Sequence, residues 1–485
     1  MVLRYHIKNV LLLIAITVSV LILISMNRHH EKQLKSTTGP EAVPLPTVKT
    51  SSVEILNYDV ARKSLDATMD RLSGYRDKVP CSRIIDQTLD GRSLRKTQLW
   101  SFDDVNFWNS FGSKPNICQV IKETFTFTTE PMSQEEFEFP LAYSLLVHSN
   151  AVQVLFLLST VYQPQNQFCI AVDETTNDDF KRQMFLLGEC FPNIFVMITP
   201  KVHWCGFSVL QGVYSCIEYL ARLRDDWKYY QYLSGVDLPL KTNLEMVRIF
   251  KKLNGSFNAG IADLPDSRYN RDHSPPLPLW KSSLSATFSR ESANFMVGSA
   301  KVHQLYEYLK NAFCPDETFW TTIAGNPNLL KMPGGFNASL WKQKLTGEWD
   351  KKYGTNETKP LLTEKKYSLF VPEKYYISRY QVWYTGNFRK FGRKCYGRFT
   401  AESCVFGVGD LKELIKRPEL VGHKFYLNTQ PAAFFCFYEH TRKRALKADT
   451  NFNVDAYGEL PGPKLLAGTP FEEVEFRAPG GYEFY

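Results

Sequence analysis

Short apolar runs alternate with amphipathic stretches along the chain from residue 140 onward. Strands are predicted at 141–148, 168–173, 194–198 and 229–233, with helices between them at 151–160, 178–190 and 205–224. Strands that alternate with helices of this length predict βαβ units and a mainly parallel sheet, hence an α/β fold. Thr242 and Glu245 have the spacing of a capping box, which predicts the start of a further helix. A last strand is predicted at 403–408.

A different pattern precedes this part of the chain. Residues 10–26 carry no charge, and as a helix they would extend for about 25 Å. This length is at the short end of what crosses a bilayer, and it predicts an uncleaved membrane anchor after a cytoplasmic tail at 1–9. The alternative is a cleaved signal peptide, although no clear small-x-small cleavage site follows the run. Basic residues flank it on both sides, so the positive-inside rule barely orients it.

The segment at 27–80 is polar, with prolines and many Lys, Ser and Thr residues. Such a composition buries too little apolar surface to fold alone, so we expect a stem here and a compact domain at 81–485. Ten cysteines, an even number, predict a disulfide framework in an oxidising compartment. N-glycosylation sequons begin at Asn254, Asn337 and Asn356. Cysteines and sequons together place everything after the anchor in the lumen of the secretory pathway.

Charge and cysteine spacing narrow the possible functions. Lys and Arg number 58 against 50 Asp and Glu, and this net charge of +8 is small for 485 residues. It does not indicate a nucleic-acid partner. The cysteines form no CxxC pairs, so a zinc site is not expected either.

Asp173 closes the second predicted strand, at the edge where parallel sheets bind ligands. It is either a turn or helix-capping residue, or a hydrogen-bonding partner of a ribose or uracil. The chain has no Asp-x-Asp motif to hold a divalent metal on a diphosphate, so Lys or Arg would have to neutralise that group. The candidates are Lys424 and the basic run Arg389, Lys390, Arg393, Lys394 and Arg398, which a solvated basic loop would also explain.

Glu317 follows Pro315 and Asp316 at a predicted helix start. Proline and acids in a first turn are ordinary helix-start residues. The alternative is a general base, because inverting sugar transfer needs one carboxylate to deprotonate the attacking hydroxyl.

Taken together, five segments resemble one known family. They are LAYSLLVH at 141–148, YQPQNQFCIAVD at 162–173, WKYYQYLSGVDLPLKTNLEMV at 227–247, CPDETFW at 314–320 and CVFGVGDL at 404–411. In this order they resemble the core-2/I-branching β-1,6-N-acetylglucosaminyltransferases. The resemblance implies a type II Golgi membrane protein with a GT-A-like nucleotide-sugar transferase fold behind its anchor. It also implies an inverting mechanism with a UDP-sugar as substrate and no metal cofactor.

The resemblance assigns roles to individual residues. Glu317 is then the catalytic base, and Arg268 and Arg271 are acceptor contacts. The donor site comprises Val147, Asp173, Trp204, Lys424 and, in part, Arg398. Disulfides are implied between Cys81 and Cys436, Cys118 and Cys190, Cys169 and Cys216, and Cys395 and Cys404. Cys205 and Cys314 are left as a fifth bridge or as two free thiols.

Departures from the family pattern affect the substrates. A second diphosphate-binding Arg is replaced by Ala401, and Arg398 is the nearest substitute. The acidic residue that reads the acceptor sugar is replaced by Gly260, with Asp263 nearby, and a family Cys is Ser234.

The preferred reading is transfer of a sugar, N-acetylglucosamine, from its UDP conjugate in β-1,6 linkage to galactose or N-acetylgalactosamine of an O-glycan or glycoprotein. The changes at Ala401 and Gly260 leave UDP-glucose open as the donor. A xylosyltransferase-like enzyme with a protein acceptor and an inactive lumenal glycan-binding or scaffold protein are the further alternatives.

Overall fold

The computed structural model describes residues 53–223, 226–269, 273–353, 375–384, 395–447 and 452–476, without the side chains of 348–353. The predicted tail at 1–9, the predicted anchor at 10–26 and the stem as far as residue 52 lie outside these residues. Among the described residues, no helix combines the length and the apolar composition that a membrane span requires.

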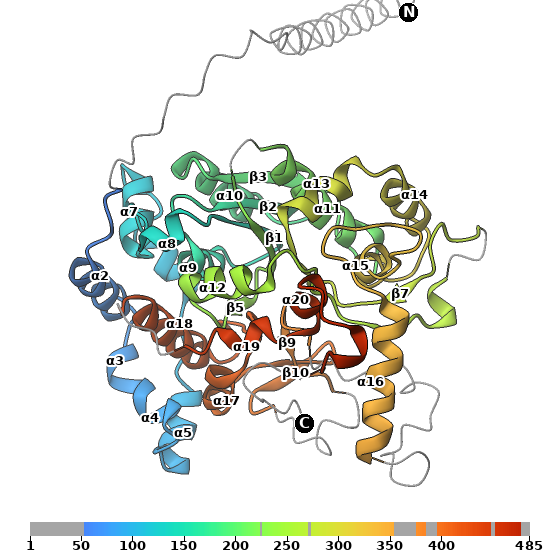
Figure 1. The fold of residues 1–485 in the computed structure, drawn as a ribbon. Coiled ribbons are helices and arrows are strands. Elements are labelled where there is room, and N and C mark those ends of the chain that lie inside the picture. The colour runs from blue at the N-terminus through green and yellow to red at the C-terminus, as the bar shows by residue number, and fades with distance from the viewer. Residues whose placement is uncertain are drawn as a thin grey trace, which may run out of the picture. The chain divides into compact units, whose positions relative to one another are not determined.

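The largest sheet among the described residues has five strands (Figure 1). Its order is β3 (Ile194–Thr199), β2 (Gln167–Asp173), β1 (Leu141–Val147), β4 (Tyr229–Ser234) and β8 (Thr287–Ser289). The first four strands are parallel, and only β8 is antiparallel to its neighbour. The predicted mixed α/β fold with a mainly parallel sheet is confirmed, and it fits a GT-A-like arrangement.

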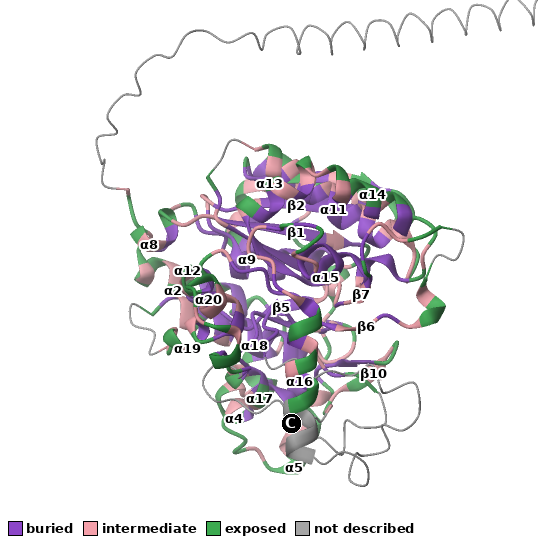
Figure 2. Cartoon of the chain, turned by 45° about the vertical axis from the view of Figure 1, so that its right-hand side comes forward, coloured by how far each residue is buried: buried purple, intermediate pink, exposed green. Residues whose placement is uncertain are grey.

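Helices cover both faces of this sheet. The connections between the parallel strands are α9 (Ala151–Val161), α10 (Asp178–Cys190) and α11 (Phe207–Arg222). Helices α9 and α10 contact each other, whereas α11 packs against α13 (Arg290–Gly298). Figure 2 shows α11 and α13 on one side of the sheet and α9 on the other. The chain therefore changes face after β3, and its return to β4 creates a switch between β1 and β4, where ligands commonly bind.

The carboxyl ends of the parallel strands meet along one edge. Val147 pairs with Val172, Asp173 pairs with Thr199, and Leu146 pairs with Ser234. Loops that leave these strands therefore begin side by side. Edges of this kind are where α/β sheets commonly bind ligands.

Smaller sheets complete the strand structure. One contains β5 (Asp237–Pro239), β12 (Val421–His423) and β9 (Tyr380–Gln381). Two antiparallel pairs are β6 (Ala262–Asp263) with β7 (Trp280–Lys281), and β10 (Arg398–Thr400) with β11 (Ser403–Val405). The strand predicted at 403–408 ends early, because the Asp410 carboxylate accepts the N–H of Gly407 and starts the 3₁₀ turn η3 (Val408–Asp410).

The compact unit begins at Val53, well before the boundary at residue 80 that the polar composition predicts. Helices α2 (Tyr58–Asp70) and α3 (Tyr75–Lys78) bury Leu65, Met69 and Tyr75. The Tyr75 hydroxyl donates to Glu439 Oε2 at 2.7 Å, on helix α18 (Pro431–Ala445). A narrow apolar stripe on otherwise polar helices is thus enough to dock residues 53–80 onto the domain.

The remaining helices pack around these sheets. They are α4 (Cys81–Ile85), α5 (Gly91–Gln98), α6 (Asp104–Asn109), α7 (Ile117–Thr124), α8 (Gln134–Phe137), α12 (Asn243–Leu253), α14 (Ala300–Leu309), α15 (Phe319–Ala324), α16 (Ala338–Tyr353), α17 (Leu411–Lys416), α19 (Asp455–Gly458) and α20 (Pro461–Leu466). The capping box at the start of α12 is present, since Thr242 and Glu245 exchange side-chain-to-backbone hydrogen bonds.

Five disulfides join all ten cysteines. Four are the pairs implied by the family resemblance: Cys81–Cys436, Cys118–Cys190, Cys169–Cys216 and Cys395–Cys404. The fifth, Cys205–Cys314, resolves the alternative that the sequence left open. Cys81 and Cys436 are 355 residues apart, so their bond ties the N-terminal helices to the last long helix.

Two of the sequon asparagines lie at helix ends. Asn254 is the exposed C-terminal cap of α12, and the side chain of Asn337 accepts the N–H of Leu340 in the first turn of α16. Asn356 lies outside the described residues.

Candidate active site

Glu317 ends a short 3₁₀ turn, η2 (Pro315–Glu317), that leads into α15. Its backbone carbonyl accepts the N–H of Ser282 at 2.6 Å, which fixes the turn against the segment after β7. Its carboxylate accepts a hydrogen bond from Arg268 Nη1 at 2.6 Å, and Lys281 Nζ lies 3.4 Å from the same oxygen. Of the predicted acceptor contacts, Arg268 therefore lies beside the predicted base. Arg271 lies outside the described residues.

Neighbouring charges drive apart the pKa values of the two adjacent carboxyl groups in this turn, those of Asp316 and Glu317. Burial acts to raise the pKa of Glu317, but Lys281 and Arg268 outweigh it and bring the pKa below its usual range. Burial, reinforced by the negative charge of Glu317, raises the pKa of Asp316 to about 7. Two carboxyls whose pKa values are driven apart are a common arrangement in acid–base catalysis. Glu317 is thus ionised at neutral pH and able to accept a proton.

An exposed aromatic pair lies next to this turn. Trp204, in the loop between β3 and α11, makes an edge-to-face contact with Phe313 at 6.1 Å between ring centroids. The Cys205–Cys314 disulfide joins the residues that follow the two rings. The predicted helix at 205–224 begins only at Phe207, because Cys205 has a φ of 57° and cannot belong to it. The disulfide thus brings the predicted donor residue Trp204 close to the base.

Asp173 closes β2 as predicted, and the residue is only 6% exposed. Oδ1 accepts the N–H and the hydroxyl of Thr175, both at 2.8 Å, while Oδ2 accepts the N–H of Val202 at 3.3 Å. The carboxylate therefore organises the turn after β2 and the loop that carries Trp204. Val147, at the end of β1, is buried. The donor-binding roles of Asp173 and Val147 stay predictions.

Lys424 follows strand β12 and is 5% exposed. Its Nζ donates to the Thr400 carbonyl at 2.9 Å and lies 5.4 Å from the centre of the Tyr426 ring. Arg398, on β10, is exposed, and its charge acts on the same tyrosine. The structure thus places these two predicted diphosphate residues around Tyr426, whereas Ala401 lies in the left-handed turn of the β10–β11 hairpin and adds no charge. The other cations of the basic run (389, 390, 393, 394) lie outside the described residues.

A buried ionic cluster lies next to Lys424 and includes His423, the residue directly before it. Asp237 is fully buried; Arg379 Nη2 lies 3.2 Å from its Oδ1, and His423 Nδ1 lies 2.7 Å from the same oxygen. The N–H of Ser234 donates to the other oxygen at 2.7 Å. Burial alone would raise the pKa of Asp237, but Arg379 and His423 lower it to about 2. The cluster therefore fixes the end of β4 against the segment that carries Lys424.

Tyr232 connects the two halves of the site. Its ring lies 5.9 Å from the Arg379 guanidinium, and the charges of Arg379, Asp237 and Asp316 all act on its hydroxyl. No hydrogen bond or ion pair joins Glu317 directly to Lys424 within the described part of the chain. The site is therefore one assembly with a base at one end and a cation at the other, around the β4 end of the sheet.

Several residues of this assembly escaped sequence reasoning. Lys281, Arg379 and His423 have no spacing signal that relates them to Glu317 or Lys424, because long loops separate them in the chain. The resemblance provides one cue, since basic acceptor contacts were expected before the base. Asp263, named near the altered acceptor position, instead pairs with Lys342.

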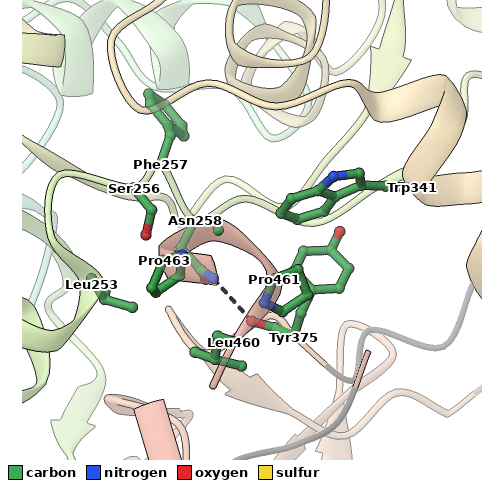
Figure 3. Close-up of a pocket in the computed structure, with 10 residues that line it drawn as sticks. Leu253, Ser256, Phe257, Asn258, Trp341, Tyr375, Leu460, Pro461 and Pro463 are labelled. Atoms are coloured by element: carbon green, nitrogen blue, oxygen red, sulfur yellow. Dashed lines mark hydrogen bonds between the residues drawn. The ribbon is translucent and has the colours of Figure 1, made fainter. Parts of the chain in front are cut away.

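Other candidate sites in the described residues do not compete. Cys395, Cys404 and Asp410 lie close enough to suggest a metal set, but the two cysteines form a disulfide and Asp410 caps a turn. Figure 3 shows a small cavity lined by Trp341, Tyr375 and residues of α20. Its volume is about 10 Å³, which leaves room for one water at most. A cavity of about 300 Å³ borders the Cys81–Cys436 bond, where Arg76 and Lys443 already pair with Glu439.

Comparison with known proteins identifies the family. The core-2/I-branching enzyme profile matches residues 141–368. A mouse N-acetyllactosaminide β-1,6-N-acetylglucosaminyl-transferase is 30% identical over 401 residues, which cover 76% of this chain and 87% of that protein. A human β-1,3-galactosyl-O-glycosyl-glycoprotein β-1,6-N-acetylglucosaminyltransferase is 28% identical over 73% of this chain and 80% of its own length. The chain therefore belongs to the core-2/I-branching enzyme family and is a glycosyltransferase.

Proposed function

We propose that the protein transfers N-acetylglucosamine from UDP-N-acetylglucosamine to the 6-hydroxyl of galactose or N-acetylgalactosamine in O-glycans, with inversion to a β linkage. The observation that carries this proposal is the Glu317 carboxylate, which accepts a hydrogen bond from Arg268 at 2.6 Å and lies 3.4 Å from Lys281, two cations that bring its pKa below the usual range. The names of the relatives support the donor sugar and the β-1,6 linkage.

In this proposal Glu317 removes the proton of the acceptor 6-hydroxyl. The oxygen attacks the anomeric carbon of the donor as the bond from that carbon to the β-phosphate oxygen breaks. Arg268, now hydrogen-bonded to Glu317, would exchange part of this contact for the acceptor sugar. By removing this proton, Glu317 makes the acceptor oxygen a better nucleophile, which is the role of a general base.

At the other end, Lys424 neutralises the charge that develops on the departing UDP. Arg398 adds a second charge from the exposed side. It lies on β10, three residues before Ala401, which occupies the position of the family Arg. With two cations in this place the reaction needs no divalent metal. Asp173, Val147 and Trp204 would hold the uridine of the UDP-sugar.

The proposed location is the Golgi membrane. Residues 10–26 would be a type II anchor, with the tail at 1–9 in the cytoplasm and the catalytic unit in the lumen. The five disulfides support an oxidising compartment for the unit from Val53 onward. The acceptor there would be a glycoprotein carrying an O-glycan.

A second donor, UDP-glucose, is favoured by one observation. Ala401 and Gly260 differ from the pattern of the family at positions near the substrates, and neither is compensated in place by a charged side chain. The transferase chemistry at Glu317 would be the same for either sugar.

A donor screen on the secreted fragment from Val53 to Tyr485 tests the proposal. The fragment starts at Val53 because α2 and α3 belong to the compact unit. It is incubated with each UDP-sugar and a benzyl glycoside of galactosyl-β-1,3-N-acetylgalactosamine, with and without EDTA, and the product linkage is read by NMR. We expect β-1,6-linked N-acetylglucosamine in both conditions. Loss of activity in EDTA, or transfer of glucose alone, would refute the metal-free mechanism or the donor, respectively.

A further inference from the structure

Two large aromatic side chains lie exposed beside the base. Trp204 is 83% exposed and Phe313 is 50% exposed, although residues with large aromatic rings usually bury most of their surface. They contact each other edge to face and form a small apolar platform. We refer to Trp204 and Phe313 as the aromatic platform.

The platform is held by the backbone on both sides. Cys205 and Cys314, directly after the two rings, have φ values of 57° and 51°, a region that residues other than glycine seldom adopt. Their disulfide and a 2.9 Å hydrogen bond from the Cys314 N–H to the Cys205 carbonyl hold the two turns together. Unusual backbone of this kind persists where surrounding structure enforces it, and it is concentrated at ligand sites.

One guanidinium connects the platform to the base. Arg268 lies 6.0 Å from the centre of the Phe313 ring, and its Nη1 donates to Glu317 at 2.6 Å. A cation over a ring face is attracted to it, so Phe313 also helps to orient Arg268. A sugar that presents a hydroxyl to Glu317 would therefore have its ring next to Phe313.

We propose that Phe313 is a stacking residue for the acceptor sugar, held in place by the Cys205–Cys314 bond and by its contact with Trp204. A pyranose has one face of C–H groups, which packs on an aromatic ring, while its hydroxyls reach polar partners at the edge. Arg268 and Lys281 are such partners. This inference rests on the proposed role of Glu317 and adds a residue that fixes the acceptor.

The acceptor sugar is more suitably placed than the donor to stack on Phe313. Phe313 precedes the turn that carries Glu317, and the base contacts the acceptor hydroxyl. Trp204 belongs to the loop that Asp173 organises through Val202, on the proposed donor side. The platform thus spans the boundary between the two substrates, with Phe313 on the acceptor side.

Acceptor affinity of the full chain in detergent tests this inference without relying on turnover. The probe is the benzyl glycoside of galactosyl-β-1,3-N-acetylgalactosamine, with binding followed by saturation-transfer NMR and KM measured in parallel. For Phe313→Ala and Phe313→Leu we expect acceptor binding and acceptor KM to weaken about tenfold, with donor KM and thermal stability unchanged. Phe313→Tyr retains the ring and should bind as the natural chain does.

A matched control is Phe185→Ala, which removes a 40% exposed phenylalanine from helix α10. It should change neither constant. The double variant Cys205→Ser/Cys314→Ser keeps both rings but releases the turns, and it should weaken acceptor binding in the same direction. Acceptor binding that is equal in Phe313→Ala and the natural chain, or a donor KM that rises as much as the acceptor KM, would overturn the inference. A chain that binds acceptor through Phe313 but transfers no sugar would instead refute the proposed function.

Discussion

Each end of the site has a carboxylate paired with basic side chains, but one cluster is partly exposed and the other is buried. Around Glu317, two cations surround one carboxylate, and all three side chains are partly exposed, at 22% for Glu317, 16% for Arg268 and 30% for Lys281. Around Asp237, the carboxylate is fully buried and one guanidinium and one imidazole converge on it. We call these the base end and the phosphate end.

The difference fits the role that we propose for each end. A base must exchange a proton and change partners, so its carboxylate remains accessible to solvent and substrate. A cation that meets a diphosphate must instead be fixed in position before the substrate arrives, because preorganised charges stabilise a developing charge most effectively. The buried Asp237, paired with Arg379 and His423, gives that rigidity to the segment that carries Lys424. The same burial keeps the Asp237 carboxylate from exchanging a proton with solvent.

The largest effect is expected from removing the base. Glu317→Gln keeps the shape and the hydrogen bond to Arg268 but cannot accept a proton, so kcat should fall by about 10³- to 10⁴-fold. Initial rates with saturating donor and acceptor measure it. Glu291→Gln, an exposed carboxylate on α13, is the control and should leave kcat unchanged. A Glu317→Gln rate within tenfold of the natural one would remove the base end from the mechanism.

The next effect concerns stability at the phosphate end. Asp237→Asn leaves Arg379 buried without its counter-ion, so the free energy of unfolding should fall by about 3–5 kcal/mol. The pKa of Asp237 lies near 2, below its ordinary value, so its contribution is present above that ordinary pKa and is lost as the pH falls toward 2. Urea unfolding of both proteins between neutral and acidic pH should show the difference shrinking only at the acidic end.

The control for that experiment is Asp59→Asn, which removes an exposed ion pair with Arg62 and should change stability by less than about 1 kcal/mol. Equal effects of the two substitutions would mean that the buried cluster has no special role.

A smaller loss of activity is expected when Lys424, the cation of the phosphate end, is replaced. Lys424→Met keeps the apolar length of the side chain and removes its charge, so kcat should fall about 10²-fold. Steady-state rates measure it, with Lys416→Met, an exposed lysine on α17, as the control. Arg398→Met should cost less than Lys424→Met, since Arg398 is exposed to solvent and Lys424 is 5% exposed. The reverse order would transfer the principal diphosphate role to Arg398.

The smallest effect separates the two cations of the base end. Lys281 is one of the groups that lower the pKa of Glu317, so Lys281→Met should raise that pKa. The acidic limb of the kcat/KM profile should then move to higher pH, while the rate at pH 8 changes by less than about fivefold. An acidic limb that does not move would show that another group titrates there.

Local patterns predicted the core of the fold. The strands of the central sheet are nearly continuous apolar runs, so the predicted 229–233 and the observed Tyr229–Ser234 differ by one residue. The helices on its faces were predicted from the amphipathic stretches between these strands. Helices α2 and α3 were missed because only a few of their residues are apolar, and their packing on α18 depends on contacts far away in the chain.

The site residues that the sequence did not predict are those that only contacts between distant parts of the chain bring into place. Glu317, Asp173 and Lys424 were found because family motifs surround them. Arg379 and Lys281 were not, since only the folded chain brings them to Asp237 and Glu317. Cys205 and Cys314 illustrate the same limit, because cysteine connectivity does not follow from the sequence alone.

The most direct test of the division between the two ends is the affinity for UDP of three proteins: the natural chain, Glu317→Gln and Lys424→Met. Titration calorimetry gives the dissociation constants without any turnover. The base end is proposed to contact the acceptor and the phosphate end the donor. We therefore predict an unchanged affinity for Glu317→Gln and an affinity about tenfold weaker or more for Lys424→Met. Weaker binding in Glu317→Gln together with unchanged binding in Lys424→Met would contradict the account.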